Sequence, residues 1–263
     1  AEKEGTSWVV KPNMIFEVHL TDANGNTHWL SPLRSNSPSV LESAKIWYES
    51  LQGTYNFTLK LLEDYELDEK LIIDFPLTID LNGKTLSMSK ACTESYEMIL
   101  NKSTLTITGN GKISFTDTSA GDPNFGWGSY TIRNEGTLVV ENGTIEHLGG
   151  TDMAYAIDVR TNGNLGDVKA TINGGTIVST YRAVRQFLNS TSCVNELEVT
   201  GGTIESTSGN YAVWFQNASN KANMGNIEIT DGNVGRVYIY SYEMDSSALN
   251  VNINVSAVEE LVS

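Results

Sequence analysis

The sequence predicts an all-β protein: a single-stranded right-handed parallel β-helix with an N-terminal hairpin-plus-helix cap. A cassette of alternating apolar and polar residues that ends in glycine recurs about every thirty residues. Between its copies, over residues 84–250, no amphipathic stretch is long enough for a helix. A fixed period in this range is typical of repeat architectures, in which each repeat packs on its neighbours.

The cassette is a short strand, a glycine turn and a second short strand. Its copies lie at 77–83, 105–111, 138–143, 170–175, 197–202 and 227–232. Their last glycines are 28, 32, 32, 27 and 30 residues apart. Glycine at the bend permits positive φ and a close approach of two backbones. A strand such as the one beginning at Thr144 then follows the turn.

A further apolar strand precedes most copies of the cassette. These strands are expected at 96–100, 130–133, 155–159, 182–185, 211–215 and 237–240. Three short strands per repeat match one coil of a parallel β-helix, with coils stacked at about 4.8 Å. We therefore expect six to seven coils over 56–255, with a β-sandwich or another β-solenoid as the alternative.

The first 55 residues are predicted to cap the open end of the solenoid. Strands at 14–20 and 27–30 flank a turn at 22–26, and a capping-box pattern at Ser39 opens a helix over 40–51. The expected apolar face of that helix contains Val40, Leu41, Ala44, Trp47, Tyr48 and Leu51. Residues 256–263 repeat the capping-box pattern. They are read as a C-terminal cap or as the start of a following module.

Charge and composition limit the partners that the chain can have. Its formal net charge is −15, which disfavours nucleic acid because binding to phosphates depends on basic side chains. No apolar stretch is long enough for a membrane span, so we expect no membrane insertion. Cys92 and Cys193 lie about three coils apart, farther than a disulfide reaches, and are expected to be free thiols.

The segments 61–68 and 77–86, together with the later Gly-Gly-Thr-Ile copies, carry a family resemblance. Over about residues 40–255 the chain resembles the pectin-lyase-like β-helix modules of large bacterial cell-surface and adhesin-type proteins. The resemblance implies an extracellular or cell-surface location, and a glycan or host-surface ligand as partner. The superfamily includes polysaccharide lyases, glycoside hydrolases, phage tailspikes and non-catalytic adhesins, so it leaves the activity open.

Alignment of the strands that precede each cassette predicts one outward-facing column of candidate ligand-binding residues. The column contains Arg133, Asp158, Arg185, Trp214 and, depending on register, Tyr238 or Tyr240. Arginine suits carboxylates and aromatic planes suit sugar rings, so the column predicts a glycan-binding face. Alternatively, Asp158 and Arg185 form an inter-coil ion pair and the aromatic rings stack as supports. Trp127, in the long loop at 116–128, is a further candidate.

No catalytic residue is assigned from the sequence. Asp158 and Arg185 are the candidates if the chain is an enzyme, because Asp158 is the one carboxylate placed in the column. A glycosidase needs a second carboxylate. The possible partners, Asp117, Glu146 and Asp152, fall on loops or other faces. His147, like His19 and His28, is expected to be a packing or surface residue.

No cofactor or metal site is predicted, although two weaker Ca²⁺ possibilities exist. The run at 22–26 resembles the start of a calcium loop but lacks its later ligands, so a hairpin turn is the main interpretation. Asp117, Asp122 and Asp152 are the other carboxylates that could bind Ca²⁺ between coils.

Three functions remain open at this point. The first is a non-catalytic extracellular module for adhesion or glycan contact, or a rigid spacer, monomeric within a longer bacterial surface protein. The second is a polysaccharide lyase or glycoside hydrolase that uses the groove of the parallel strands. The third is a fragment of a phage tailspike, in which a trimeric solenoid binds host glycans.

Overall fold

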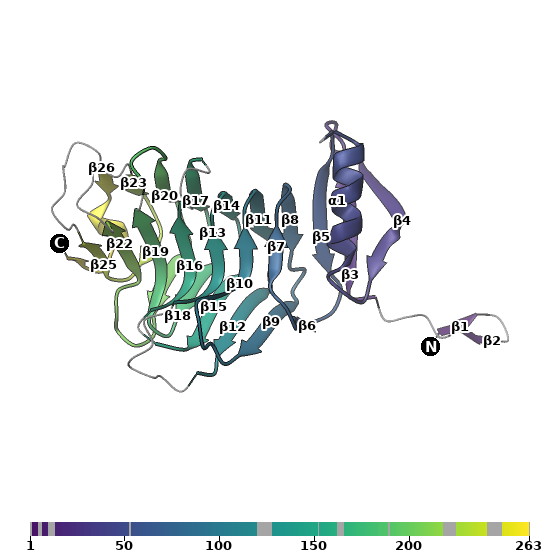
Figure 1. Ribbon diagram of the computed structural model, residues 1–263, viewed down its shortest axis with the longest axis horizontal. Coiled ribbons are helices and arrows are strands. Elements are labelled where there is room, and N and C mark those ends of the chain that lie inside the picture. The colour runs from purple at the N-terminus through teal and green to yellow at the C-terminus, as the bar shows by residue number, and fades with distance from the viewer. Residues whose placement is uncertain are drawn as a thin grey trace.

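The computed structural model describes residues 2–4, 7–9, 14–52, 54–119, 128–151, 153–161, 166–188, 190–217, 225–240 and 249–262. Its strands form three sheets that wind around one core as a parallel β-solenoid of about six turns (Figure 1). Each turn adds one strand to each sheet, which confirms the all-β solenoid prediction. A separate antiparallel pair is formed by β1 (Glu2–Glu4) and β2 (Ser7–Val9).

The largest sheet has ten strands and continues into the N-terminal hairpin. In spatial order it contains β26 (Leu249–Ile253), β23 (Gly225–Ile229), β20 (Asn195–Val199), β17 (Val168–Ile172), β14 (Thr137–Val140), β11 (Thr104–Thr108), β8 (Leu77–Asp80), β5 (Asn56–Leu61), β3 (Phe16–Thr21) and β4 (Thr27–Ser35). The strands from β26 to β5 are parallel, whereas β3 pairs antiparallel with both β5 and β4. The predicted hairpin is therefore confirmed, and it extends this sheet.

The other two sheets consist of solenoid strands alone. The eight-stranded sheet contains β27 (Leu261–Val262), β25 (Val237–Tyr240), β22 (Val213–Asn217), β19 (Arg182–Leu188), β16 (Ala154–Arg160), β13 (Ser129–Asn134), β10 (Tyr96–Asn101) and β7 (Leu71–Ile73). The seven-stranded sheet contains β24 (Asn233–Val234), β21 (Thr203–Ser206), β18 (Thr176–Ser179), β15 (Thr144–Gly149), β12 (Lys112–Asp117), β9 (Thr85–Lys90) and β6 (Tyr65–Glu66). Both are parallel throughout.

Equivalent residues of successive repeats lie over one another, because the strands pair in register. One buried column of the ten-stranded sheet contains Ile79, Ile107, Val140, Ile172, Val199 and Ile229. Each of these side chains has 0% of its surface exposed. Such columns join into a continuous core, so a coil that is thin by itself is stabilised by its two neighbours.

The glycine turns join the ten-stranded sheet to the seven-stranded sheet. Because the coils stack closely, the residue at the bend of each turn must lack a side chain. Gly175 has φ +77°, and a Cβ atom there would lie 2.4 Å from the carbonyl oxygen of Gly143 in the preceding coil. Gly202 repeats the arrangement, since its Cβ would lie 2.8 Å from the carbonyl oxygen of Gly175. The recurring glycine is therefore a consequence of backbone contact between coils.

The helix α1 (Val40–Ser50) covers one end of the solenoid, next to β3, β4 and β5 (Figure 1). Val40, Leu41 and Ala44 are buried there, as expected from the sequence. Two details of the prediction are wrong. Ser39 has helical backbone angles and makes no side-chain capping bond, and Trp47 is 38% exposed instead of packed on the core.

The C-terminal segment continues the solenoid and forms no α-helix among the described residues. The expected capping box at Ser256 is instead a short 3₁₀ turn, η2 (Val255–Ala257), capped by the side chain of Asn254. Val258 then bridges to Val234, and β27 pairs parallel with β25. The preceding coil has an open strand edge here. A strand that pairs with this edge satisfies its backbone N–H and C=O groups, which a helix would leave unpaired.

Candidate binding face

The predicted column lies on the outer face of the eight-stranded sheet. Strand pairing aligns Arg133 with Asp158, Asp158 with Arg185, Arg185 with Trp214 and Trp214 with Tyr238. The alternation of the strands places neighbouring residues such as Ile157 and Val184 in the core instead. Tyr238 is thus the column member and Tyr240 lies next to it, with ring centroids 6.1 Å apart. Trp127 lies outside the described residues.

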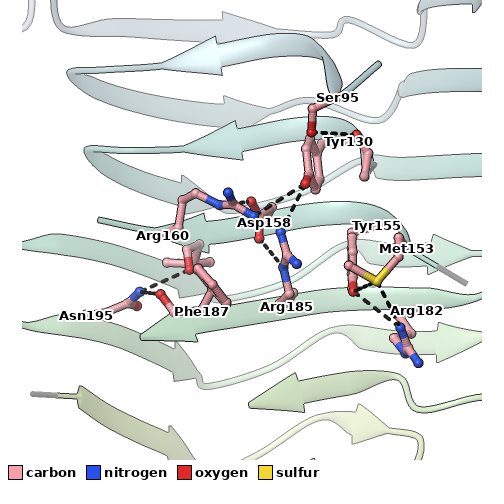
Figure 2. Close-up of polar contacts among 12 residues, drawn as sticks. Ser95, Tyr130, Met153, Tyr155, Asp158, Arg160, Arg182, Arg185, Phe187 and Asn195 are labelled. Atoms are coloured by element: carbon pink, nitrogen blue, oxygen red, sulfur yellow. Dashed lines mark hydrogen bonds and ion pairs between the residues drawn. The ribbon is translucent and has the colours of Figure 1, made fainter. Parts of the chain in front are cut away.

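The centre of the column is a buried ion-pair cluster. The Asp158 side chain has 0% of its surface exposed, and that of Arg185 has 3%. Arg185 Nε donates to Asp158 Oδ1 at 2.6 Å, and Arg160 Nε donates to Asp158 Oδ2 at 2.6 Å (Figure 2). Both guanidinium groups also donate to the hydroxyl oxygen of Tyr130, at 3.1 and 3.4 Å. We call these four residues the Arg–Asp cluster.

Aromatic rings cover the buried centre of the cluster, whereas Arg160 at its edge keeps 18% of its side-chain surface exposed. The guanidinium of Arg185 lies 4.4 Å from the ring centroid of Tyr155 and 5.0 Å from that of Phe187. The ring of Tyr130 stacks on that of Tyr155, with centroids 5.9 Å apart. Burial raises the pKa of Tyr155 to about 12 and raises the pKa of Tyr130 as well. Both phenols therefore stay neutral over the physiological pH range.

The charges of Asp158 and Arg185 stabilise each other in the ionised state. Burial raises the pKa of the Asp158 carboxyl above its ordinary value, and the Arg185 guanidinium opposes that rise. Each carboxylate oxygen accepts an N–H, an arrangement that fits the ionised carboxylate. Burial disfavours the Arg185 cation, but the charge of Asp158 holds its pKa above the ordinary value. The ion pair that the sequence left as an alternative is therefore present, and it is inaccessible to a ligand in this structure.

Beyond the cluster, toward the C-terminus, the same face carries half-buried aromatic side chains. Tyr211, Trp214, Tyr238 and Tyr240 form what we call the aromatic strip. The rings of Tyr211 and Tyr238 stack with centroids 4.5 Å apart, and Tyr240 is 36% exposed. The guanidinium of Arg182 lies 4.0 Å from the Trp214 ring centroid.

The aromatic strip is anchored to the rings around the buried cluster and to the end of the solenoid. Arg182 Nη1 donates to the Tyr155 hydroxyl at 3.3 Å, which joins the strip to the rings around the cluster (Figure 2). Arg236 lies 5.0 Å from the Tyr211 ring centroid and pairs with Glu260 at 2.6 Å. The aromatic planes are thus held at fixed spacing along a rigid sheet.

Sequence reasoning found the column but missed the residues that bury it. Tyr130, Tyr155 and Phe187 decide whether Asp158 meets solvent, and none of them was singled out as a site residue; only Arg160 was expected near the column. One signal was available, because Tyr130 and Tyr155 occupy equivalent places in successive strands. At the edge of the column, Arg133 pairs with Glu135 at 2.6 Å and is 21% exposed.

The other sequence candidates do not assemble into a second site. The turn at Asp22 is a hairpin turn whose carboxylate accepts from the backbone N–H groups of Asn24 and Asn26, as the main interpretation held. Asp117 is buried and accepts from the N–H groups of Ser119 and Cys92. Over the ranges that the structure describes, no group of three or more His, Cys, Asp or Glu side chains could hold a metal ion. Asp122 and Asp152 lie outside those ranges.

The two cysteines and His147 are buried residues. Cys92 and Cys193 are both buried, and neither forms a disulfide, as the sequence predicted. His147 is a packing residue, 0% exposed, with its ring 5.2 Å from that of Phe115.

Comparison with protein-family models, with curated proteins and with solved structures gives no match in any of the three cases. In the described part of the chain, no helix has the length and apolar character needed to cross a membrane.

Proposed function

We propose that this solenoid is a non-catalytic glycan-binding module of a bacterial cell-surface or secreted protein. The observation that carries the proposal is the aromatic strip, which is partly exposed and stacks on Tyr155, one of the rings around the Arg–Asp cluster. A rigid sheet that presents spaced aromatic planes binds extended polymers without needing a deep pocket. The location outside the cell rests on the resemblance to pectin-lyase-like modules, and the net charge of −15 favours solubility there.

Sugar chemistry fits the aromatic strip for a physical reason. The C–H edges of a sugar ring carry partial positive charge, and they pack on the negative face of an aromatic ring. Arg182 lies beside Trp214 and can donate to sugar hydroxyl or carboxylate oxygens while its stem stays packed. The predicted ligands are therefore neutral or acidic oligosaccharides that lie along the solenoid axis.

The geometry of Asp158 argues against the enzymatic alternative. A general base or nucleophile must reach a substrate, but both oxygens of Asp158 are occupied by guanidinium donors and the side chain is fully buried. Glu146, one of the sequence candidates for a second carboxylate, belongs to β15 in the seven-stranded sheet, where it accepts from Lys112 and Ser114. The two carboxylates therefore do not flank one groove.

A glycan array followed by titration calorimetry tests the proposal. We expect the wild-type protein to bind a defined oligosaccharide, and Tyr240→Ala to weaken that binding roughly tenfold, about 1.4 kcal/mol. Trp47→Ala is the matched control. It removes an aromatic side chain of similar exposure, 38%, from the distant helix α1, so it should leave binding unchanged.

Two results would contradict the proposal. Equal loss of binding in Tyr240→Ala and Trp47→Ala would show that the aromatic strip is not the site. Release of reducing ends or unsaturated products from any bound polysaccharide would show that the protein is an enzyme. Light scattering on the same samples addresses the tailspike alternative, which requires a trimer.

A further inference from the structure

The N-terminal end of the solenoid is capped unevenly. The hairpin β3–β4 extends only the ten-stranded sheet, whereas the eight-stranded sheet ends at β7 and the seven-stranded sheet ends at β6. Among the described strands, none pairs with the outer edge of either terminal strand. Edge strands present unpaired backbone donors and acceptors that can bind a further strand.

The backbone of Ile72 is the part of β7 that faces this open edge. Ile73 accepts from Lys102 N at 2.8 Å, so the polar groups of Ile73 point toward the neighbouring strand β10. Polar groups of successive residues in a strand point to opposite sides. The N–H and C=O of Ile72 therefore point away from β10, and the Ile72 side chain is 48% exposed.

A groove of about 550 Å³ lies along this edge, between α1 and β7. Its volume is within the range of roughly 300–1,000 Å³ that is usual for ligand sites. Leu41 of α1 contributes to one wall, and Leu67, Leu71 and Phe75 line the side of the solenoid, although each of the four is at most 8% exposed. An apolar lining next to an open strand edge is the combination that extended peptides recognise.

The charges around the groove favour a basic occupant. Its lining includes two lysines, and both are paired: Lys45 with Asp74 at 2.5 Å and Lys70 with Glu97 at 2.7 Å. Three further lining residues are exposed carboxylates that form no ion pair with any described residue: Glu42, Asp68 and Glu69. A strand placed here would meet apolar side chains on one face and negative charge on its rim.

We propose that this groove binds an extended basic peptide, which adds a strand to β7. The residues of such a strand alternate between two faces. Apolar residues of the peptide would pack on Leu71 and Phe75, and lysine or arginine residues would reach Glu42, Asp68 and Glu69. The partner is therefore a protein segment with alternating apolar and basic residues. This site lies at the opposite end of the solenoid from the aromatic strip and does not depend on glycan binding.

Fluorescence anisotropy with two synthetic heptapeptides tests the proposal. One probe alternates lysine with valine, and the other alternates glutamate with valine. We expect saturable one-to-one binding of the lysine peptide at physiological salt, and binding of the glutamate peptide at least about tenfold weaker.

Two sets of variants localise the binding to the groove. Ile72→Pro removes the edge N–H but leaves the bonds between β7 and β10 in place, so we expect about tenfold weaker binding. Ile72→Thr keeps the N–H and a β-branched side chain, and it should bind like the wild type. The variant carrying Glu42→Gln, Asp68→Asn and Glu69→Gln changes only exposed side chains and should also bind about tenfold more weakly.

Three outcomes would overturn the proposal. Equal binding to the wild type, Ile72→Pro and the carboxylate variant would overturn the proposal, as would no binding of the lysine peptide. A concentration-dependent dimer that Ile72→Pro abolishes would assign the groove to a second copy of the chain and would equally overturn it. Thermal unfolding of each variant verifies that the solenoid is intact.

Discussion

The outer faces of two adjacent sheets differ, although both belong to the same repeats. In the ten-stranded sheet, β17 and β20 alternate strictly between buried and half-buried residues. In the eight-stranded sheet, β16 is buried at every residue except Arg160. The ion pairs differ accordingly: Lys169 and Glu198 are 42% and 32% exposed, whereas Asp158 and Arg185 are 0% and 3% exposed.

The difference shows that coverage by neighbouring side chains, and not the repeat itself, decides whether an outward-facing residue is exposed to solvent. On the ten-stranded sheet the outward residues are short or flexible polar groups that remain in water. On the eight-stranded sheet the rings of Tyr130, Tyr155 and Phe187 lie over the charges. Desolvated charges must be paired, and the second arginine at position 160 completes that pairing.

The largest expected effect comes from removal of the buried carboxylate. Asp158→Ala leaves the buried Arg185 guanidinium and the partly exposed Arg160 guanidinium without their anion, so we expect a loss of about 3–5 kcal/mol in the free energy of unfolding. Glu198→Ala breaks the exposed pair on the other sheet and should cost less than about 1 kcal/mol. Urea unfolding measures both.

A second variant tests whether charge or packing stabilises the covered face. Replacement of the pair by apolar residues, Asp158→Leu with Arg185→Met, should restore most of the stability lost in Asp158→Ala, because no unpaired Arg185 charge remains. Equal losses in Asp158→Ala and Glu198→Ala would contradict the distinction drawn between the two sheets.

The pH dependence of stability tests a buried group that, unlike the Arg–Asp cluster, has no hydrogen-bond partner among the described residues. Burial lowers the pKa of His147 to about 4, and neither ring nitrogen has a hydrogen-bond partner among the described residues. Because its folded pKa lies below its unfolded value, the native state holds the neutral ring. Protonation of the unfolded chain then destabilises the protein as pH falls from about 6.5 to about 4.

The expected loss over that interval is about 3 kcal/mol. His147→Phe, which continues the ring column of Phe115, should remove this part of the pH dependence of urea unfolding. Identical pH dependence in the wild type and the variant would show that His147 does not titrate in this way.

The turns allow a smaller and more local comparison. Gly175→Ala combines positive φ with a contact of 2.4 Å to the carbonyl oxygen of Gly143, whereas Gly209→Ala has φ +75° and no atom within 4 Å. Strain at φ alone costs about 1–2 kcal/mol, so Gly209→Ala should lose that amount and Gly175→Ala more. Thermal unfolding measures the two midpoints. Equal losses would mean that the coils are not held in contact at Gly175.

The smallest expected effect is at the start of α1. A working N-cap contributes about 1 kcal/mol, but Ser39 forms no side-chain bond to the helix. Ser39→Ala should therefore change the free energy of unfolding by less than about 0.5 kcal/mol. A larger loss would show that the serine does cap the helix in solution.

Much of the architecture could be predicted because it is encoded locally. The glycine at the end of each cassette marks the place where two backbones meet, and alternation along the strands assigns residues to the core. Those two features aligned Arg133, Asp158, Arg185 and Trp214 correctly. The helix over Val40–Ser50 followed from the apolar pattern, even though its expected cap was wrong.

By itself, the sequence determined the repeat and the column as far as Trp214, because both depend on spacing along the chain. The structure decided the register of the last strand, where Tyr238 and not Tyr240 pairs with Trp214. Only the tertiary structure decided that Asp158 is enclosed and that Trp214 and Tyr240 keep exposed surface. Enclosure depends on which large side chains of neighbouring coils cover a residue on the outer face. Strand alternation predicts which residues face outward, but not which of them are covered. The same holds for Ser256, where the open edge of the preceding coil favoured a strand over the helix that the local pattern predicts.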